Sequence, residues 1–284
     1  MAGSASAGPV VNSMVEKKGE SDWTAERVNR FWQYYASRPD LRGTYFSLQM
    51  GAGMTRFLDQ AGVLRGDVLD YGCGLGFLCE AMLARRVECW GCDGSPDAVQ
   101  ASDRLLRGKR GWHGASLSSD PRAPFRDRRF DLVTCIETVE HLPPEGKTRV
   151  LSDIGSLLRP GGSLFITTPN DEELGRAMHY CPFCDAEFHS MQHLSSFDRG
   201  ALRLLLEGAG FEVIYSDAVD FAEIQAPVVP SLLDLSARSL LRSARRLAFE
   251  SYDRLSGRRF PSRFEHPKAG QKFPHLVALA VKRG

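Results

Sequence analysis

A short apolar segment runs directly into a glycine-rich loop, and this junction restricts the folds open to the chain. Val68-Leu69-Asp70-Tyr71 has the character of a buried strand, and Gly72, Gly74 and Gly76 follow before a helical segment at 75–85. Glycine permits a sharp turn and a close approach of a ligand to the backbone. The following helix offers unpaired N–H groups. The junction therefore predicts a ligand site at the carboxyl end of a parallel sheet.

A second acidic residue closes the next expected strand. Asp93 lies 23 residues after Asp70, where a carboxylate can accept hydrogen bonds from both hydroxyls of a ribose. The glycine spacing is G-x-G-x-G, whereas the dinucleotide fingerprint is G-x-G-x-x-G. An acid two residues before the first glycine would repel a phosphate and favour a cationic ligand with an amino group. The pattern therefore disfavours a nicotinamide cofactor.

Strands alternate with helices along most of the chain, which predicts a parallel sheet covered on both faces. A helix is expected from Ser21, with Ser21 or Asp22 as its N-cap, and a second from about Tyr45 to Ala61. The later strands are expected at 87–92, 112–117, 130–135, 163–168, 211–219 and 275–281. The predicted organisation is a disordered tail (1–20), an N-terminal helical cap (21–66), a core with a Cys/His lid segment at 178–197 (67–226), a helical insert (227–272) and a last core strand (273–284).

Composition limits the partners and the compartment. The 36 Lys and Arg residues nearly balance the 35 Asp and Glu residues, so no bulk electrostatic attraction to nucleic acid is expected. No apolar run approaches the roughly 18 residues of a membrane helix, and the first 20 residues do not resemble a secretory signal. Seven cysteines in a chain of this length do not resemble a disulfide framework, so we expect a reducing, cytoplasmic location.

From about Val68 to Phe211 the chain resembles the class I S-adenosylmethionine-dependent methyltransferases. The segment 70–76 resembles their first motif, the segments 123–125 and 130–133 resemble their "LPF…FD" stretch, and 158–162 resembles their "L-x-P-G-G" turn. The resemblance implies a Rossmann-like sheet of seven strands in the order 3-2-1-4-5-7-6, with the last strand antiparallel. It also implies S-adenosyl-L-methionine as cofactor, bound by Asp70, Gly72, Cys73, Gly74, Gly76, Asp93, Gly94, Asp120 and Ile136.

The segment after the fourth strand carries Glu137, Glu140 and His141. Two carboxylates and an imidazole could hold Mg²⁺, Mn²⁺ or Zn²⁺. The E-x-x-E-H string is similar to the metal motif of ubiquinone-pathway O-methyltransferases and of small-RNA 3′-terminal 2′-O-methyltransferases. In those families the metal gathers vicinal hydroxyls and a later His adds a ligand, for which His193 is the candidate here. The alternative is that no metal binds and that His141 is a base or a substrate contact, supported by the two glutamates.

A cysteine–histidine segment lies between the fifth strand and the next helix. Cys181 and Cys184 are followed by His189 and His193, in the spacing C-x2-C-x4-H-x3-H. Two thiolates on a turn and two imidazoles one helical turn apart can make a tetrahedral zinc site. Alternatively, the two histidines face the active site as substrate contacts and the cysteines are packed inside, or the cysteines form a disulfide.

Aromatic residues near the N-terminus and a basic insert are the remaining candidates. Tyr34, Tyr35 and Tyr45 are expected to contact the substrate, because similar methyltransferases shape the acceptor pocket with N-terminal helices. The insert is expected to form a lid helix. The alternatives are that 229–256 contacts a membrane surface or that the insert forms a homodimer surface.

The sequence as a whole predicts a methyltransferase acting on oxygen of a small-molecule or glycan-type acceptor. Methyl transfer is an in-line displacement, so the site must align the acceptor and exclude water. Deprotonation would be by a His base or assisted by a metal. The alternatives are an RNA 2′-O-methyltransferase, an N- or C-methyltransferase, and a non-catalytic cofactor-binding partner protein.

Overall fold

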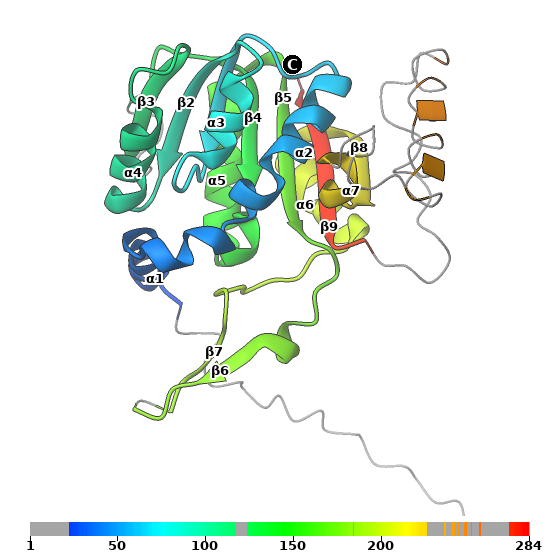
Figure 1. Ribbon diagram of the computed structural model, residues 1–284. Helices are drawn as coiled ribbons and strands as arrows, with labels where there is room; N and C mark the ends of the chain where they lie inside the picture. The colour runs from blue at the N-terminus through cyan, green and yellow to red at the C-terminus, as the bar shows by residue number, and fades with distance from the viewer. Residues whose placement is uncertain are drawn as a thin grey trace, which may run out of the picture.

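The computed structural model describes residues 23–117, 124–183, 185–225 and 273–283, with a few single positions between 236 and 256. One sheet has the strand order β3-β2-β1-β4-β5-β9-β8 (Figure 1). Its strands are β1 (Asp67–Tyr71), β2 (Glu88–Asp93), β3 (Trp112–Leu117), β4 (Phe130–Ile136), β5 (Leu158–Pro169), β8 (Phe211–Val219) and β9 (His275–Lys282). β9 is antiparallel to both β5 and β8. The predicted order is therefore confirmed, with β8 and β9 as the sixth and seventh strands.

Helices cover both faces of this sheet. α2 (Phe46–Gln60), α3 (Phe77–Leu83), α4 (Pro96–Leu106) and α7 (Phe221–Gln225) pack on one face, and α5 (Pro144–Leu157) and α6 (Arg199–Gly208) pack on the other. Successive side chains of a strand point to opposite faces. Val68 and Leu69 are accordingly both fully buried but belong to different apolar clusters, one on each face. This two-sided burial explains why β1 is apolar at both positions.

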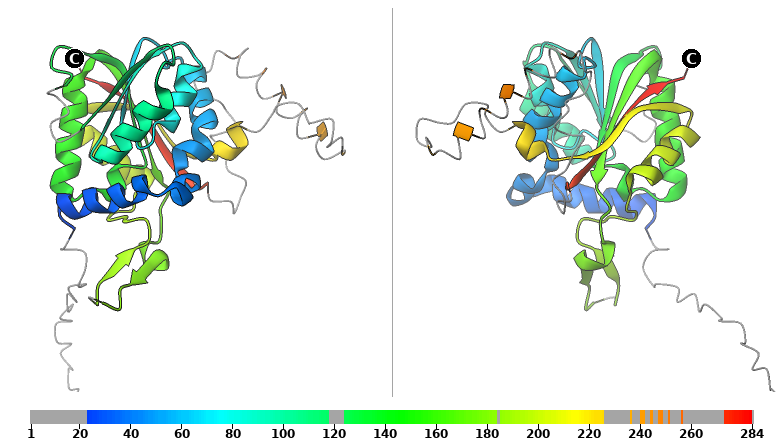
Figure 2. Two further views of the ribbon diagram at one scale, coloured as in Figure 1. Left: turned by 60° about the vertical axis from the view of Figure 1, so that its left-hand side comes forward. Right: turned by 90° about the vertical axis from the view of Figure 1, so that its right-hand side faces the viewer.

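The helix α1 (Ala25–Ser37) lies across the edge of the sheet where the strands end (Figure 2). Its N-cap is Thr24, whose side chain accepts a hydrogen bond from the backbone N–H of Arg27. The prediction of Ser21 or Asp22 as the cap was therefore wrong, because the first helical turn begins after Thr24. A 3₁₀ turn, η2 (Pro39–Thr44), separates α1 from α2.

Between β5 and α6 the chain leaves the core and forms a small hairpin. The turn η4 (Leu174–Ala177) leads into β6 (Met178–Tyr180) and β7 (Glu187–His189), which pair antiparallel with Met178 opposite His189. The hairpin projects beyond the edge of the sheet that α1 covers (Figure 1). The sequence predicted a lid segment here but not its strands, since three residues are too short to show an alternating pattern.

Some predictions concern residues outside the described part of the chain. These are the tail at 1–20, Asp120, Cys184 and nearly all of the insert at 227–272, including its membrane-surface or dimer role. Among the described helices, none has the length and apolar character needed to cross a membrane.

Candidate active site

A pocket of about 520 Å³ opens where the strands of the sheet end. Its size lies within the range of about 300–1,000 Å³ that is usual for small-molecule sites. The lining comes from α1, the start of α2, the ends of the strands β1 to β4 with the loops that follow them, the start of α4, and α5. The pocket is therefore built at the carboxyl end of the parallel strands, as the sequence predicted.

A side chain at either of two positions would strain the glycine loop. Gly72 and Gly74 have φ angles of 82° and 52°, a region that other residues rarely adopt. A Cβ atom on Gly72 would lie 2.6 Å from Thr138 Oγ1, and one on Gly74 would lie 3.2 Å from the Tyr45 ring. Both glycines line the pocket, whereas Gly76 does not and instead packs the loop against α4.

Two acids flank this loop in different surroundings. Asp93 lines the pocket, and its carboxylate oxygens accept one backbone N–H each, from Gly74 at 2.9 Å and from Ser95 at 2.8 Å. Asp70 is 2% exposed and accepts a hydrogen bond from Thr134 Oγ1 at 2.7 Å. Burial raises the pKa of Asp93, and it raises the pKa of Asp70 to about 6. A cationic ligand would favour the ionised form of both groups.

The remaining predicted binding residues are divided between the pocket and its surroundings. Cys73, Gly94 and Ile136 line the pocket. Of the three tyrosines, Tyr45 lines it, while the Tyr35 hydroxyl points to Met191 Sδ at 3.8 Å, in the lid segment. Tyr34 is 54% exposed and is not a lining residue.

The turn after β4 carries two acids, Glu137 and Glu140, whose hydrogen bonding differs. Glu137 accepts a hydrogen bond from Thr167 Oγ1 at 2.8 Å, and burial raises its pKa to about 7. Glu140 lies in the next turn, η3 (Val139–His141), and is fully buried. No well-aligned hydrogen bond from the described chain reaches either carboxylate oxygen of Glu140, although Glu137 and Thr168 lie close to it. Burial and the nearby Glu137 raise the pKa of Glu140 well above its usual value. An unpaired buried carboxylate is costly, which points to a partner such as a cation or a proton.

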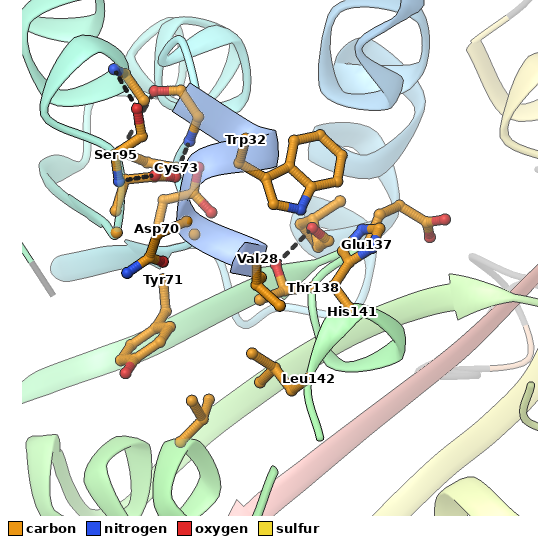
Figure 3. Close-up of a pocket in the computed structure, with 18 of the residues that line it drawn as sticks. Val28, Trp32, Asp70, Tyr71, Cys73, Ser95, Glu137, Thr138, His141 and Leu142 are labelled. Atoms are coloured by element: carbon orange, nitrogen blue, oxygen red, sulfur yellow. Dashed lines mark hydrogen bonds between the residues drawn. The ribbon is translucent and has the colours of Figure 1, made fainter. Parts of the chain in front are cut away.

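His141 is 5% exposed and packs with its ring 4.6 Å from that of Trp32 on α1 (Figure 3). Its Nδ1 lies 3.4 Å from the carbonyl oxygen of Gln192, which accepts its proton. Burial lowers the pKa of His141 to about 3. The imidazole is therefore neutral at neutral pH, and one of its two nitrogens carries a lone pair.

The lid segment brings His193 to this turn. One ligand atom from each of Glu140, His141 and His193 lies within 4.8 Å of the others. His189 and His193 also form a similar group with Glu172, a residue that the sequence analysis did not single out. Three of the four predicted divalent-metal ligands are thus neighbours, whereas Glu137, three residues before Glu140, is outside this group.

The structure does not place Cys181 with the two histidines. Cys181 follows β6 and its N–H donates to the carbonyl of Ala186, while His189 pairs with Met178 at the other end of the hairpin. Three residues along a strand correspond to roughly 10 Å. The described members of the predicted zinc site are therefore separated along the hairpin.

The lid is tied to α1 and to His141 through Gln192. The Trp32 indole N–H donates to Gln192 Oε1 at 3.1 Å, and Gln192 Nε2 donates to the His141 carbonyl at 3.0 Å. Gln192 is fully buried and has a φ of 57°. These partners are 160 and 51 residues apart, so no local pattern in the sequence could have indicated them.

Comparison with known proteins identifies the family. A model of the methyltransferase domain matches residues 41–216, which is more than half of the chain. The chain belongs to this methyltransferase family. The ubiquinone biosynthesis O-methyltransferase of Aeromonas salmonicida is 36% identical over 115 residues, which is 39% of this chain and 47% of that protein. The chain spans about half the length of the curated relatives that it matches.

Solved structures share the fold at low identity. A Haloferax volcanii putative methyltransferase, solved in complex with the Trm112 methyltransferase activator, gives a TM-score of 0.57 at 18% identity and covers 89% of this chain and 98% of its own. A DhpI–SAH complex gives 0.55 at 16% identity, covering 90% and 97%. The chain thus has the Rossmann-like fold of these structures, and S-adenosylmethionine is the cofactor of the methyltransferase family to which it belongs.

Proposed function

We propose that this methyltransferase acts on an oxygen of a small-molecule or glycan-type acceptor with neighbouring hydroxyls, and that Glu137, Glu140, His141 and His193 hold a divalent cation. The observation that carries the proposal is the buried Glu140 carboxylate, which has no hydrogen-bond partner among the described residues and lies beside two imidazoles. The curated relatives named as O-methyltransferases support oxygen as the acceptor atom.

The pocket fits S-adenosylmethionine, which supplies an electrophilic methyl group on a sulfonium. Each Asp93 oxygen accepts one backbone N–H and retains a lone pair, which can accept from a ribose hydroxyl. The ionised forms of Asp70 and Asp93 suit a cationic ligand. Tyr45 and Trp32 both line the pocket, and their rings would help to exclude water from the reacting groups.

The donor set at the turn after β4 fits a divalent cation better than it fits a histidine base. A general base works best with a pKa near the working pH, and the pKa of His141 is lowered to about 3. A neutral imidazole is instead a good metal ligand through its unprotonated nitrogen. A cation held by these residues would gather two adjacent hydroxyls and lower the pKa of one of them. The neutral histidines and buried carboxylates then serve to orient the acceptor for in-line attack.

Metal removal tests this proposal. Protein purified without a His-tag and stripped with a chelator should transfer labelled methyl to a catechol probe only after Mg²⁺, Mn²⁺ or Zn²⁺ is added. Glu140→Gln should lose this metal-dependent activity by about 100-fold or more while binding S-adenosylhomocysteine normally. Glu145→Gln, an exposed acid on α5, is the matched control and should behave as wild type. Full activity of the wild-type protein in the chelator would overturn the proposal.

A further inference from the structure

Glu172 lies between two histidines at the base of the lid segment. Its Oε2 is 2.5 Å from His193 Nδ1, and its Oε1 is 3.5 Å from His189 Nε2. The two imidazole rings stack with their centres 4.6 Å apart. His189 is 4% exposed and Glu172 is half-buried, so the three side chains form a compact, largely dehydrated group.

The backbone determines which nitrogen of His189 carries the proton. His189 Nδ1 accepts N–H groups from His193 at 3.2 Å and from Met191 at 3.4 Å. The proton of a neutral ring must then be on Nε2, which is buried and faces Glu172. Coordination of a metal through Nε2 would require the proton on Nδ1, against two N–H donors. This arrangement favours a His189 whose Nε2–H faces Glu172 at 3.5 Å, without a well-aligned hydrogen bond, over His189 as a metal ligand.

His193 carries its proton on the other ring nitrogen, Nδ1. Its Nδ1 faces a carboxylate, which can only accept when ionised, so Nδ1 carries the proton and Nε2 carries the lone pair. The same ring lies 4.9 Å from the ring of His141 and belongs to the group with Glu140. With Nδ1 engaged by Glu172, Nε2 is the nitrogen left for a ligand at that group.

We propose that Glu172 is a positioning residue, which with His189 behind it holds His193 in the Nδ1–H tautomer and presents His193 Nε2 to the cation. The inference rests on the proposed function for the identity of that ligand. Carboxylates that orient metal-binding histidines in this way commonly alter metal affinity 10- to 100-fold when removed. Nothing in the local sequence indicates the role, because Glu172 and His193 are 21 residues apart.

The ¹⁵N chemical shifts of the histidine rings in the metal-free protein test the tautomer directly. The wild-type protein should show His193 protonated at Nδ1 and His189 at Nε2. Glu172→Ala should shift His193 toward the Nε2–H form and weaken Mn²⁺ binding by roughly 10- to 100-fold, with S-adenosylhomocysteine binding unchanged. Glu173→Ala is the matched control, because Glu173 is the next residue, is exposed and pairs with Arg176.

The outcomes separate the two proposals. If wild-type His193 carries its proton on Nε2, or if Glu172→Ala leaves the His193 tautomer unchanged, the positioning role is overturned, whether or not the protein binds a metal. If the tautomers are as expected but wild-type protein binds no Mn²⁺, Mg²⁺ or Zn²⁺, the orienting contact stands and the metal proposal fails. The wild-type measurement alone decides the tautomer, so the test does not depend on the folding of a variant.

Discussion

Buried acids around the pocket differ in how their charge is compensated. Asp93 receives two backbone N–H groups and Asp70 receives a threonine hydroxyl, whereas the oxygens of Glu140 receive none from the described residues. Compensated acids can remain charged beside a cationic ligand, while an uncompensated one needs a cation or a proton. Carboxylates around one pocket therefore have different expected roles, and hydrogen bonding decides which.

Asp70→Asn should change how stability depends on pH. Burial raises the pKa of Asp70 to about 6, while the ordinary value is 3.8. Between these values the folded protein keeps a proton that the unfolded chain releases, so this residue lowers the free energy of unfolding as the pH rises. The variant lacks this penalty. Its free energy of unfolding relative to wild type should therefore increase by roughly 2 kcal/mol from pH 4 to pH 7, measured by urea denaturation without cofactor. A difference that does not vary with pH would contradict the buried acid.

At the scale of elements, Gln192 of the lid connects α1 to η3, beside the contact of Tyr35 with Met191. The Trp32 indole N–H is its donor from α1, and the carbonyl of His141 is its acceptor in η3. The helix that covers the pocket is thereby connected to the turn that carries the candidate catalytic group. Access to the pocket and order in the lid should consequently change together.

Trp32→Phe should loosen α1 without unfolding the core. The variant leaves the fully buried Gln192 Oε1 without its donor, which costs about 1–3 kcal/mol. Hydrogen exchange of the amides in 25–37 should become correspondingly faster, while exchange in β1 and β4 should not change. Trp23→Phe, just before the same helix and outside the pocket lining, is the control. Unchanged exchange in α1 would show that the contact does not hold the helix.

Features that depend on residues close in the sequence could be predicted, whereas features that depend on contacts between distant residues could not. The glycine loop, Asp93 and the order of the sheet follow from local patterns that the family shares, and all three are reflected in the sequence. The hairpin β6–β7 has strands of three residues each, too short for a periodic signal. Glu172 and Gln192 act only through partners distant in the chain, so their roles became visible only when the lid was placed.

At the scale of the whole molecule, the pocket is lined by residues from both apolar clusters, which lie on opposite faces of the sheet. Cys73 and Ile136 belong to the cluster beneath α2 and α3, whereas Tyr71 belongs to the cluster beneath α5, and all three line the pocket. A ligand that fills the pocket therefore contacts both clusters and the covering helix α1. Because the unfolded chain lacks this pocket, ligand binding should stabilise the entire domain.

S-adenosylhomocysteine should accordingly raise the melting temperature measured by scanning calorimetry. At 100 times the dissociation constant, a ligand adds about 2.7 kcal/mol to the free energy of unfolding, which corresponds to roughly 5–10 °C for a domain near this size. NAD should give no shift, because the acid before the glycine loop disfavours a phosphate. Asp93→Asn should lose most of the shift at the same ligand concentration, since an amide cannot accept from two N–H groups and a ribose. Glu88→Gln, an exposed acid at the opposite end of β2, should retain the full shift. A shift with NAD, or an undiminished shift in Asp93→Asn, would exclude this mode of binding.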